Sequence, residues 1–194
     1  MIKLGITGGI ASGKSMVTKI LSTMGIPSYL TDDRAKVLMK QSPDIKRKLI
    51  ELLGEEVYIG GELNKKVLAN FLFASNENAT LINNIVHPVV KEDFIAWVKM
   101  HEDYPLVVME CAILIEANFI DAVDVSVLVY APLDVRIERA IKRDASTRNL
   151  IEQRIKAQYP ESKKIKHVDY LIENDGESLL LPQVYKLLED LDIN

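Results

Sequence analysis

The sequence predicts an α/β fold built around a parallel sheet of five strands. Short runs rich in Val, Leu and Ile alternate along the chain with segments whose apolar residues recur at helical spacing. This alternation is typical of parallel sheets with right-handed crossovers. A length of 194 residues suits one cored domain with insertions, and 48% hydrophobic and 27% charged residues exclude collagen-like and disordered chains.

The individual elements follow from local composition. Residues 2–6 form a short apolar run before a glycine-rich loop, and residues 14–24 have apolar side chains at helical spacing until Gly25, which ends the helix. Residues 106–109 and 125–130 are rich in Val and Leu, as strands buried on both faces are. The expected strands cover residues 2–6, 26–30, 106–109, 125–130 and 170–173, and helices are expected over 14–24 and 179–191.

A long segment separates the second and third strands. Helical patterns occur there at residues 46–53, 65–74 and 89–100, too many for a single crossover, so we expect a helical excursion. The organisation expected is one domain over residues 1–194. Its parts are a core of residues 1–32 and 105–194, a helical region over about 33–104 and a lid over about 136–162.

Composition excludes several classes of protein. The single cysteine, Cys111, cannot form an intrachain disulfide, and no His, Cys and acid spacing suggests zinc. The N-terminus lacks the pattern of a signal peptide, and no apolar stretch is long enough to span a membrane. A net charge of −4 argues against general nucleic-acid binding. We therefore expect a cytoplasmic protein with no nucleic-acid, membrane or obligate protein partner.

The most specific motif lies near the N-terminus. Between the first expected strand and helix, the chain matches G-x-x-x-x-G-K-[ST] with Gly8, Gly9, Ile10, Ala11, Ser12, Gly13, Lys14 and Ser15. Such a loop turns backbone N–H groups toward phosphate oxygens, while the lysine reaches the terminal phosphates and the hydroxyl ligates Mg²⁺. An ordinary glycine-rich turn does not account for Lys14 and Ser15 at both fixed positions. The motif predicts a P-loop NTPase fold that binds a nucleoside triphosphate.

Two carboxylates are expected near this loop, because ligands gather at the carboxyl ends of parallel strands. Asp32 follows the second strand and could accept a proton from an attacking hydroxyl or help to hold the metal. Its alternative role is to cap the following helix, as Asp33 also could. Glu110, after the third strand, has the position of a Walker-B acid that binds Mg²⁺; the alternative is a surface carboxylate.

A basic segment follows the fourth strand. Residues 136–166 contain ten Lys or Arg against four Asp or Glu. Arg136, Arg139 and Arg143 share one helix face, and guanidinium groups suit bidentate phosphate contacts. We interpret the segment as a lid that closes over the triphosphate and excludes water. Ion pairs within the helix, for example with Asp144, are the alternative.

The pair His87-Pro88 is more typical of a helix start than of chemistry, because Pro88 suits the first position of a helix. We expect the helix over residues 89–100 to begin there.

Taken together, these residues resemble the dephospho-coenzyme A kinase family along essentially the whole chain. That family typically shows G-G-I-G-S-G-K-S, an Asp-x-Asp after the second strand, an H-P pair, a P-L-L-F-E-like segment, a Q-x-x-R-x-x-x-R lid motif and a late D-x-x-I-x-N. The corresponding segments here are Gly8 to Ser15, Leu30 to Asp32, His87-Pro88, Ala112 to Glu116, Arg136 to Arg143 and Asp169 to Asn174. The resemblance implies transfer of the ATP γ-phosphate to the ribose 3′-hydroxyl of dephospho-coenzyme A, with Mg²⁺.

The resemblance also implies roles for single residues. Asp32 would be the base, with Lys14 and Arg139 stabilising the transferring group. Arg143 and Asn174 would join the loop in binding ATP, with Asn174 near the adenine. His87 and Glu116 would lie on the acceptor side, and Ser15, Asp32 and Glu110 are the candidate metal ligands. Four residues depart from the family pattern: Leu30 replaces the first Asp, Ala11 a loop glycine, Ala112 a proline and Arg136 a glutamine. We expect Ala11 to have a mild effect unless its position needs a positive φ.

Two other functions are compatible with a phosphate loop. Another small-metabolite or nucleoside monophosphate kinase would share the loop, sheet and lid but bind a different acceptor. A nucleotide-dependent regulatory switch is disfavoured, because guanine-binding switches usually carry N-K-x-D and the only N-K here, Asn64-Lys65, lacks the Asp.

Overall fold

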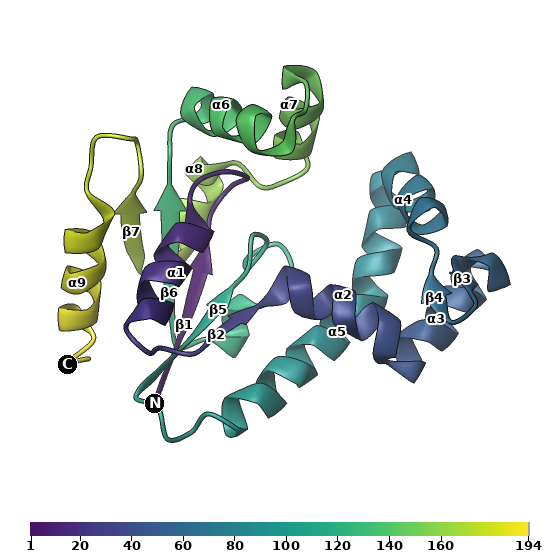
Figure 1. Ribbon diagram of the computed structural model, residues 1–194, viewed down its shortest axis with the longest axis horizontal. Coiled ribbons are helices and arrows are strands. Elements are labelled where there is room, and N and C mark those ends of the chain that lie inside the picture. Colours follow the sequence, from purple (N-terminus) through teal and green to yellow (C-terminus); the bar gives the residue numbers. More distant parts are fainter. Residues whose placement is uncertain (194) are drawn as a thin grey trace. The chain divides into compact units, whose positions relative to one another are not determined.

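The structure is a computed structural model that describes residues 1–193 (Figure 1). The chain forms two compact units. Met1–Leu30 and Val98–Asn194 make up one, which we call the sheet unit, and Thr31–Trp97 make up the other, which we call the helical unit.

The sheet unit is built on a parallel sheet of five strands in the order β2-β5-β1-β6-β7. The strands are β1 (Ile2–Thr7), β2 (Ser28–Leu30), β5 (Leu106–Glu110), β6 (Val125–Tyr130) and β7 (Tyr170–Glu173). The predicted fold class is confirmed. β2 begins two residues later than predicted because Pro27 has no N–H to donate, although its carbonyl still accepts from the Val108 N–H at 2.9 Å.

Helices connect and cover these strands. They are α1 (Lys14–Thr23), α6 (Leu133–Asp144), α7 (Arg148–Lys156), α8 (Glu161–Lys164) and α9 (Leu180–Asp190). The predicted lid corresponds to α6, α7 and α8. The turn between α6 and α7 is tight, because Ala145 ends α6 with a φ of 47° and Thr147 caps α7 by accepting from the Leu150 N–H at 3.5 Å.

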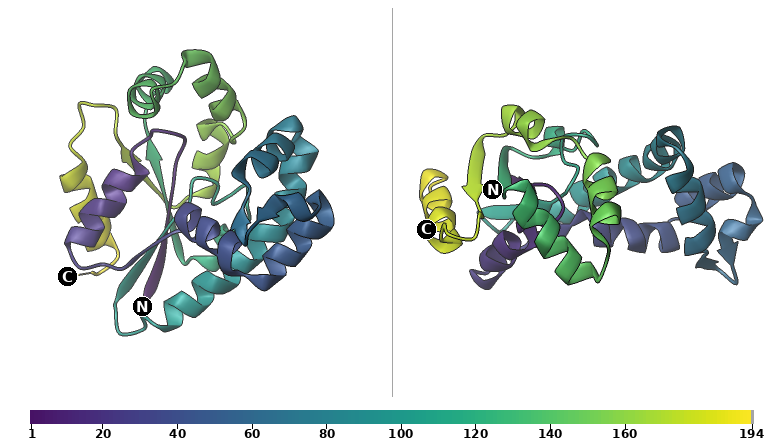
Figure 2. Two further views of the ribbon diagram at one scale, coloured as in Figure 1. Left: turned by 45° about the vertical axis from the view of Figure 1, so that its right-hand side comes forward. Right: turned by 90° about the horizontal axis from the view of Figure 1, so that it is seen from above.

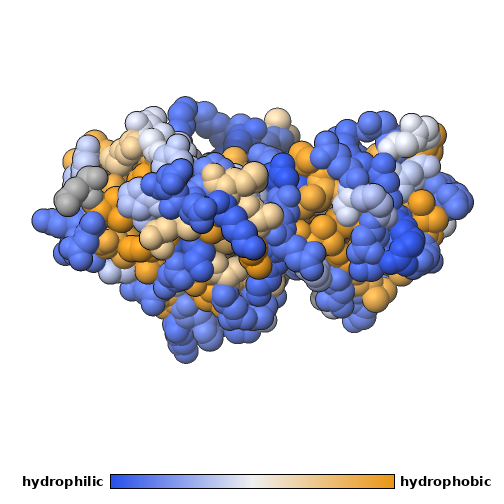
Figure 3. Space-filling model, turned by 90° about the horizontal axis from the view of Figure 1, so that it is seen from below, coloured by the Kyte–Doolittle hydropathy of each residue, from blue (hydrophilic) through white to orange (hydrophobic). Residues whose placement is uncertain are grey.

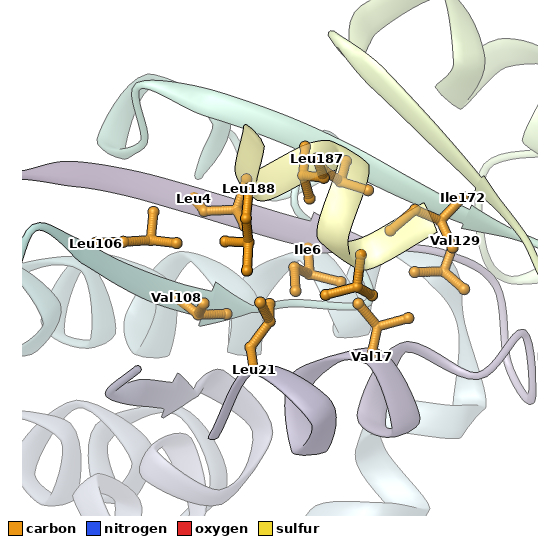
Figure 4. Close-up of a cluster of buried hydrophobic side chains, with 12 residues drawn as sticks. Leu4, Ile6, Val17, Leu21, Leu106, Val108, Val129, Ile172, Leu187 and Leu188 are labelled. Atoms are coloured by element: carbon orange, nitrogen blue, oxygen red, sulfur yellow. The ribbon is translucent and has the colours of Figure 1, made fainter. Parts of the chain in front are cut away.

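The core of the sheet unit lies between the sheet and the helices α1 and α9, which lie side by side on one face (Figures 1 and 2). Apolar side chains from all of these elements except β2 meet in one cluster (Figure 4). Its buried members are Leu4, Ile6, Val17, Leu21, Leu106, Val108, Val127, Val129, Ile172, Val184, Leu187 and Leu188. This packing fixes α1, and with it the loop that leads from β1 into α1.

The opposite face of β1 is also closely packed. Strand side chains alternate between faces, so Gly5 faces away from Leu4 and Ile6. A Cβ at Gly5 would lie 2.9 Å from Cδ2 of Leu114 and 3.0 Å from Cγ2 of Val123. The segment after β5 therefore covers this face of the sheet.

The helical unit contains α2 (Thr31–Gln41), α3 (Pro43–Leu53), α4 (Lys65–Ala74) and most of α5 (Asn76–Lys99). A small antiparallel hairpin of β3 (Tyr58–Ile59) and β4 (Glu62–Leu63), which was not predicted, precedes α4. Two hydrogen bonds from Arg34 to Asp93, at 2.9 and 2.7 Å, join α2 to α5.

The prediction that a helix begins at Pro88 is wrong. α5 runs through it as one helix with Pro88 in its interior. A proline there removes one main-chain hydrogen bond. A stripe of buried side chains, each four residues from the next, continues through the helix on both sides of Pro88 and outweighs that loss. The stripe consists of Ile82, Val86, Val90, Phe94 and Val98.

None of the helices within the described residues is both long and apolar enough to cross a membrane. On the face drawn in Figure 3, hydrophilic side chains cover most of the area and hydrophobic ones form patches between them.

The core predicts a contrast between two leucines. Leu21 of α1 is fully buried, and its replacement by Ala should lower the free energy of unfolding by about 2–5 kcal/mol, because it removes buried methyl groups and leaves a cavity. Leu181 of α9 is 47% exposed, and the same replacement there should cost less than about 1 kcal/mol. Urea unfolding followed by circular dichroism measures both. Equal losses would contradict the assignment of Leu21 to the packed core.

Candidate active site

The loop of residues 8–13 leaves the carboxyl end of β1 and opens α1. Gly8 and Gly13 have φ values of 153° and 105°, which glycine adopts far more readily than other residues. A Cβ at Gly8 would lie 2.5 Å from the Val129 carbonyl oxygen, and one at Gly13 would lie 2.0 Å from Nδ2 of Asn174. Both glycines are therefore required by conformation and by packing.

The main chain of the loop closes around the carbonyl of Gly9. That oxygen accepts from the Ser12 N–H at 3.1 Å and from Nζ of Lys14 at 3.4 Å. Gly13 makes no side-chain cap at the start of α1. The Met16 and Val17 N–H groups donate to the Gly13 carbonyl at 2.9 and 3.2 Å, so an anion at the start of α1 would be received by the N–H groups before them, with the helix dipole adding to their attraction.

Ser15 and Glu110 form a pair of oxygen donors beside the loop. Oγ of Ser15 donates to Oε1 of Glu110, the last residue of β5, at 2.7 Å. Hydroxyl and carboxylate oxygens fit Mg²⁺, which usually takes one or two protein ligands together with phosphates and waters. Among the described residues, no group of three His, Cys, Asp or Glu side chains could hold a metal by itself. A Mg²⁺ ion at this site would be held jointly with the nucleotide.

Ala11 has a φ of 59°, in the left-handed region. Position 11 does need a positive φ, so the replacement of the family glycine by Ala11 is not expected to be mild. The conformation costs an alanine about 1 kcal/mol. Ala11 packs against a small buried cluster of lid residues, Ile137, Ala140 and Ile151, and this contact offsets part of the cost.

Asn174, directly after β7, joins three parts of the sheet unit. Its Nδ2 donates to the Ser12 carbonyl at 2.7 Å, and its main-chain N–H donates to the Tyr130 carbonyl at 2.8 Å. Its own carbonyl accepts from Nη1 of Arg139 at 2.9 Å. The predicted contact of Asn174 with adenine remains a prediction; the contacts observed hold the phosphate loop against β6 and α6.

The three arginines of α6 have different partners. Arg139 donates to a neutral carbonyl, that of Asn174. Arg143 makes two hydrogen bonds to Asp144, at 2.7 and 3.1 Å, and Arg154 of α7 adds a third at 2.7 Å. These bonds, with Arg143 first, lower the pKa of Asp144 to about 2, so its carboxylate stays ionised at neutral pH. Arg143 thus has the ion-pair partner named as the alternative to nucleotide binding.

Arg136 is buried and forms an ion pair with Glu161 at 2.8 Å. A second ion pair, at 2.9 Å, joins the fully buried Lys164 to Oε1 of Glu116. That oxygen also accepts from the Tyr159 N–H at 2.9 Å, and Lys164 donates to the Ala112 carbonyl at 2.7 Å. Glu116 therefore ties the end of the lid to the segment after β5, and its predicted role in acceptor binding remains a prediction.

Asp32 and His87 lie in the helical unit. Asp32 is exposed in the first turn of α2, within the helix rather than capping it. His87 lies in the middle of α5, and burial lowers its pKa below the ordinary 6.5, so its imidazole is neutral at pH 7. The roles of Asp32 as base and metal ligand and of His87 in acceptor binding therefore remain predictions.

Three residues at the site were not predicted: Gln158, Glu161 and Lys164. Gln158 accepts from the Ile10 N–H at 3.0 Å, and Glu161 accepts from the Gly9 N–H at 3.3 Å. The sequence carried one indication of such a partner. Arg136 replaces the family glutamine, and an arginine buried at that position needs a carboxylate nearby.

The family model for dephospho-CoA kinase matches residues 2–179. The chain belongs to the dephospho-CoA kinase family. A relative named dephospho-CoA kinase from Bacteroides fragilis (strain YCH46) is 47% identical over 187 residues, which are 96% of this chain and 91% of that protein. Another, from Porphyromonas gingivalis, is 40% identical over 190 residues, 97% of this chain and 94% of that protein. The resemblance drawn from the motifs is confirmed.

Solved structures share the fold of this chain. The crystal structure of a Thermus thermophilus protein superposes with a TM-score of 0.81 at 30% identity and covers 98% of this chain and 95% of that one. The dephospho-CoA kinase from Campylobacter jejuni gives a TM-score of 0.71 at 18% identity, covering 97% and 96%. A shikimate kinase from Acinetobacter baumannii gives 0.57 at 16% identity, covering 98% and 93%. The last two, at such low identity, show the shared fold alone.

The contacts of Asn174 predict how its loss affects this family member. Asn174→Ala removes the hydrogen bond to the loop, so affinity for ATP and for GTP should fall by the same factor, about fivefold for one hydrogen bond near 1 kcal/mol. Titration calorimetry with both nucleotides measures this. Gln183→Ala is the control, because Gln183 donates at 2.9 Å to the carbonyl of Glu173, the residue that precedes Asn174. A change in the ratio of the two affinities would instead indicate contact with the base.

Proposed function

We propose that this protein transfers the γ-phosphate of ATP to the ribose 3′-hydroxyl of dephospho-coenzyme A and so forms coenzyme A. The main support is the phosphate loop with Lys14 and Ser15 at its end, in a chain that belongs to the dephospho-CoA kinase family. The direct test measures ATP consumption with dephospho-coenzyme A, nucleoside monophosphates and sugars as separate acceptors. Turnover with only one of the other acceptors would identify a different small-metabolite kinase.

The loop binds the polyphosphate in this proposal. The N–H groups at the start of α1 hold the phosphate oxygens, and Nζ of Lys14, which donates to the Gly9 carbonyl, contacts the terminal phosphates. Ser15 and Glu110 hold Mg²⁺ together with the phosphates, and Asp32 is a further candidate ligand. The ion neutralises charge on the phosphates when it is bound.

Asp32 is the proposed general base. It lies two residues beyond Leu30, the end of β2, and Leu30 is in register with Glu110 of β5. The chain therefore leaves the sheet at the edge where parallel sheets bind ligands. The 3′-oxygen bonds to the γ-phosphorus while the bond to the bridging oxygen of ADP breaks, and the hydroxyl proton passes to Asp32. Leu30 supplies no carboxylate where the family often has one, which leaves this task to Asp32.

The lid supplies positive charge to the transferring group. Arg139 donates to a neutral carbonyl in this structure, so its charge is available to phosphate. Arg143 would have to exchange Asp144 for the nucleotide. Exclusion of water by the lid protects ATP from hydrolysis.

The helical unit is the proposed acceptor region. A neutral His87 can hydrogen-bond to the acceptor without requiring a counter-charge. Glu116 is the second proposed acceptor ligand, through the carboxylate oxygen that Lys164 does not bind. A cytoplasmic location and the lack of nucleic-acid, membrane and obligate protein partners remain predictions from the sequence.

Asp32→Asn tests the base. This variant should lower kcat by at least about 10²-fold, because the amide cannot accept the proton, while affinity for ATP stays close to wild type. Steady-state kinetics and calorimetry measure the two effects. Asp33→Asn is the matched control, since Asp33 is adjacent, 65% exposed and paired with Lys36 at 2.8 Å. An unchanged kcat for Asp32→Asn, or an equal loss for Asp33→Asn, would exclude this role.

Arg139→Lys tests whether the lid acts through geometry. Lysine keeps the charge but not the planar fork of donors, so kcat should remain well below wild type, within the roughly 10²- to 10³-fold loss typical of a removed stabilising donor. Arg154→Lys on α7 is the control. Full activity of Arg139→Lys would mean that charge alone is sufficient.

A further inference from the structure

A buried ion pair lies directly against the phosphate loop. Nη1 of Arg136 and Oε1 of Glu161 are 2.8 Å apart, and the two side chains are only 6% and 12% exposed. Nε of Arg136 has no hydrogen-bond partner in the described part of the chain, so the Glu161 carboxylate is what balances this guanidinium. Such a pair is costly to break on one side, because the remaining charge stays buried.

The pair contacts the loop through Gly9. The Gly9 N–H donates to Oε1 of Glu161 at 3.3 Å. A Cβ at Gly9 would lie 1.6 Å from Nη1 of Arg136 and 2.7 Å from its Cζ. Only a glycine leaves room for the guanidinium to lie against the main chain here.

The next peptide is held from both sides. The Ile10 N–H donates to Oε1 of Gln158 at 3.0 Å. The Gly9 carbonyl, on the other side of the same planar peptide, accepts from Nζ of Lys14 at 3.4 Å and from the Ser12 N–H at 3.1 Å. Orientation of this peptide by Gln158 therefore also orients the oxygen on which Lys14 rests.

We propose that Arg136, Gln158 and Glu161, here called the lid anchor, are positioning residues for ATP binding. Glu161 and Gln158 hold the peptides before and after Gly9, and Arg136 holds Glu161. Through these peptides the lid anchor places Lys14 where the terminal phosphates arrive. Arg136 thus differs from Arg139, because it acts through the loop and does not contact the nucleotide. The inference deepens the proposed function and rests on it for the identity of the nucleotide.

The chemistry of the pair predicts that its orientation matters. The Gly9 N–H needs an acceptor, which a carboxylate supplies and a guanidinium cannot. Exchange of the two residues, Arg136→Glu with Glu161→Arg, can re-form an ion pair but places a donor opposite the Gly9 N–H. This double variant should therefore regain thermal stability without regaining affinity for ATP.

Titration calorimetry of ATP without acceptor, together with thermal unfolding, tests the proposal. Glu161→Leu should weaken ATP binding about tenfold, because one charge-assisted hydrogen bond to the loop is lost. Glu161→Gln should lose less, since its amide oxygen can still accept from Gly9. The exchanged double variant should regain thermal stability relative to Glu161→Leu but not ATP affinity. Arg148→Gln is the control, because it removes one lid charge from an exposed pair with Glu152.

Recovery of ATP affinity together with stability in the exchanged variant would overturn the proposal, as would wild-type affinity in Glu161→Leu. If the ion-pair variants do not fold, Gln158→Leu decides, because it removes an acceptor from Ile10 and leaves the ion pair intact. Its loss of ATP affinity should largely disappear in a Lys14→Ala background, since both changes act through the same peptide. Additive losses would show that Gln158 does not act through Lys14 and would reject the mechanism.

These outcomes are separate from the identity of the acceptor. If dephospho-coenzyme A is not phosphorylated, ATP titrations still test the lid anchor. If the lid anchor has no effect on ATP binding, phosphotransfer to dephospho-coenzyme A remains testable with the wild-type protein.

Discussion

The sheet unit is organised by one constraint, the curved main chain of residues 8–13, in which the Gly9 and Ile10 N–H groups donate to Glu161 and Gln158 of the lid. A chain curved in this way turns its carbonyls outward, and a buried carbonyl without a donor is costly. Donors from the surroundings meet this need. Nδ2 of Asn174 donates to Ser12, and Nζ of Lys14 donates to Gly9. The shape of the phosphate loop thus depends on side chains that belong to other elements.

The strand order explains why these partners can reach the loop. β6 is paired directly with β1, and β7 with β6. The segments that follow these strands therefore leave the same edge of the sheet as the loop does. Asn174 comes directly after β7, and Arg136 lies on α6, which follows β6. Gly9 and Gly13 are the points of contact, because a side chain at either position would collide with Arg136 or Asn174.

The sequence predicted the features that depend on local composition and missed those that depend on distant partners. The strands could be predicted because strands buried on both faces are continuous runs of apolar residues. The loop could be predicted because phosphate binding requires its glycines, lysine and serine at fixed spacing. The prediction of a helix start at Pro88 was wrong because the buried contacts along α5 outweigh the local tendency of proline to interrupt a helix. The hairpin around Gly60-Gly61 was not predicted, although a pair of glycines between two short segments is typical of a hairpin turn. Arg136 and Glu161, 25 residues apart, share no local pattern.

The charge of the lid is a further case in which composition and structure differ. Ten basic residues within residues 136–166 suggested a strongly cationic lid, but several are paired internally. Arg136 is balanced by Glu161, Lys164 by Glu116, and Arg143 and Arg154 share Asp144. Among the salt bridges of the described residues, none involves Arg139, which donates to a neutral carbonyl. The field at the phosphate loop therefore depends less on the number of basic residues than on which of them lacks an acidic partner, and among the three arginines of α6, all within the described residues, that residue is Arg139.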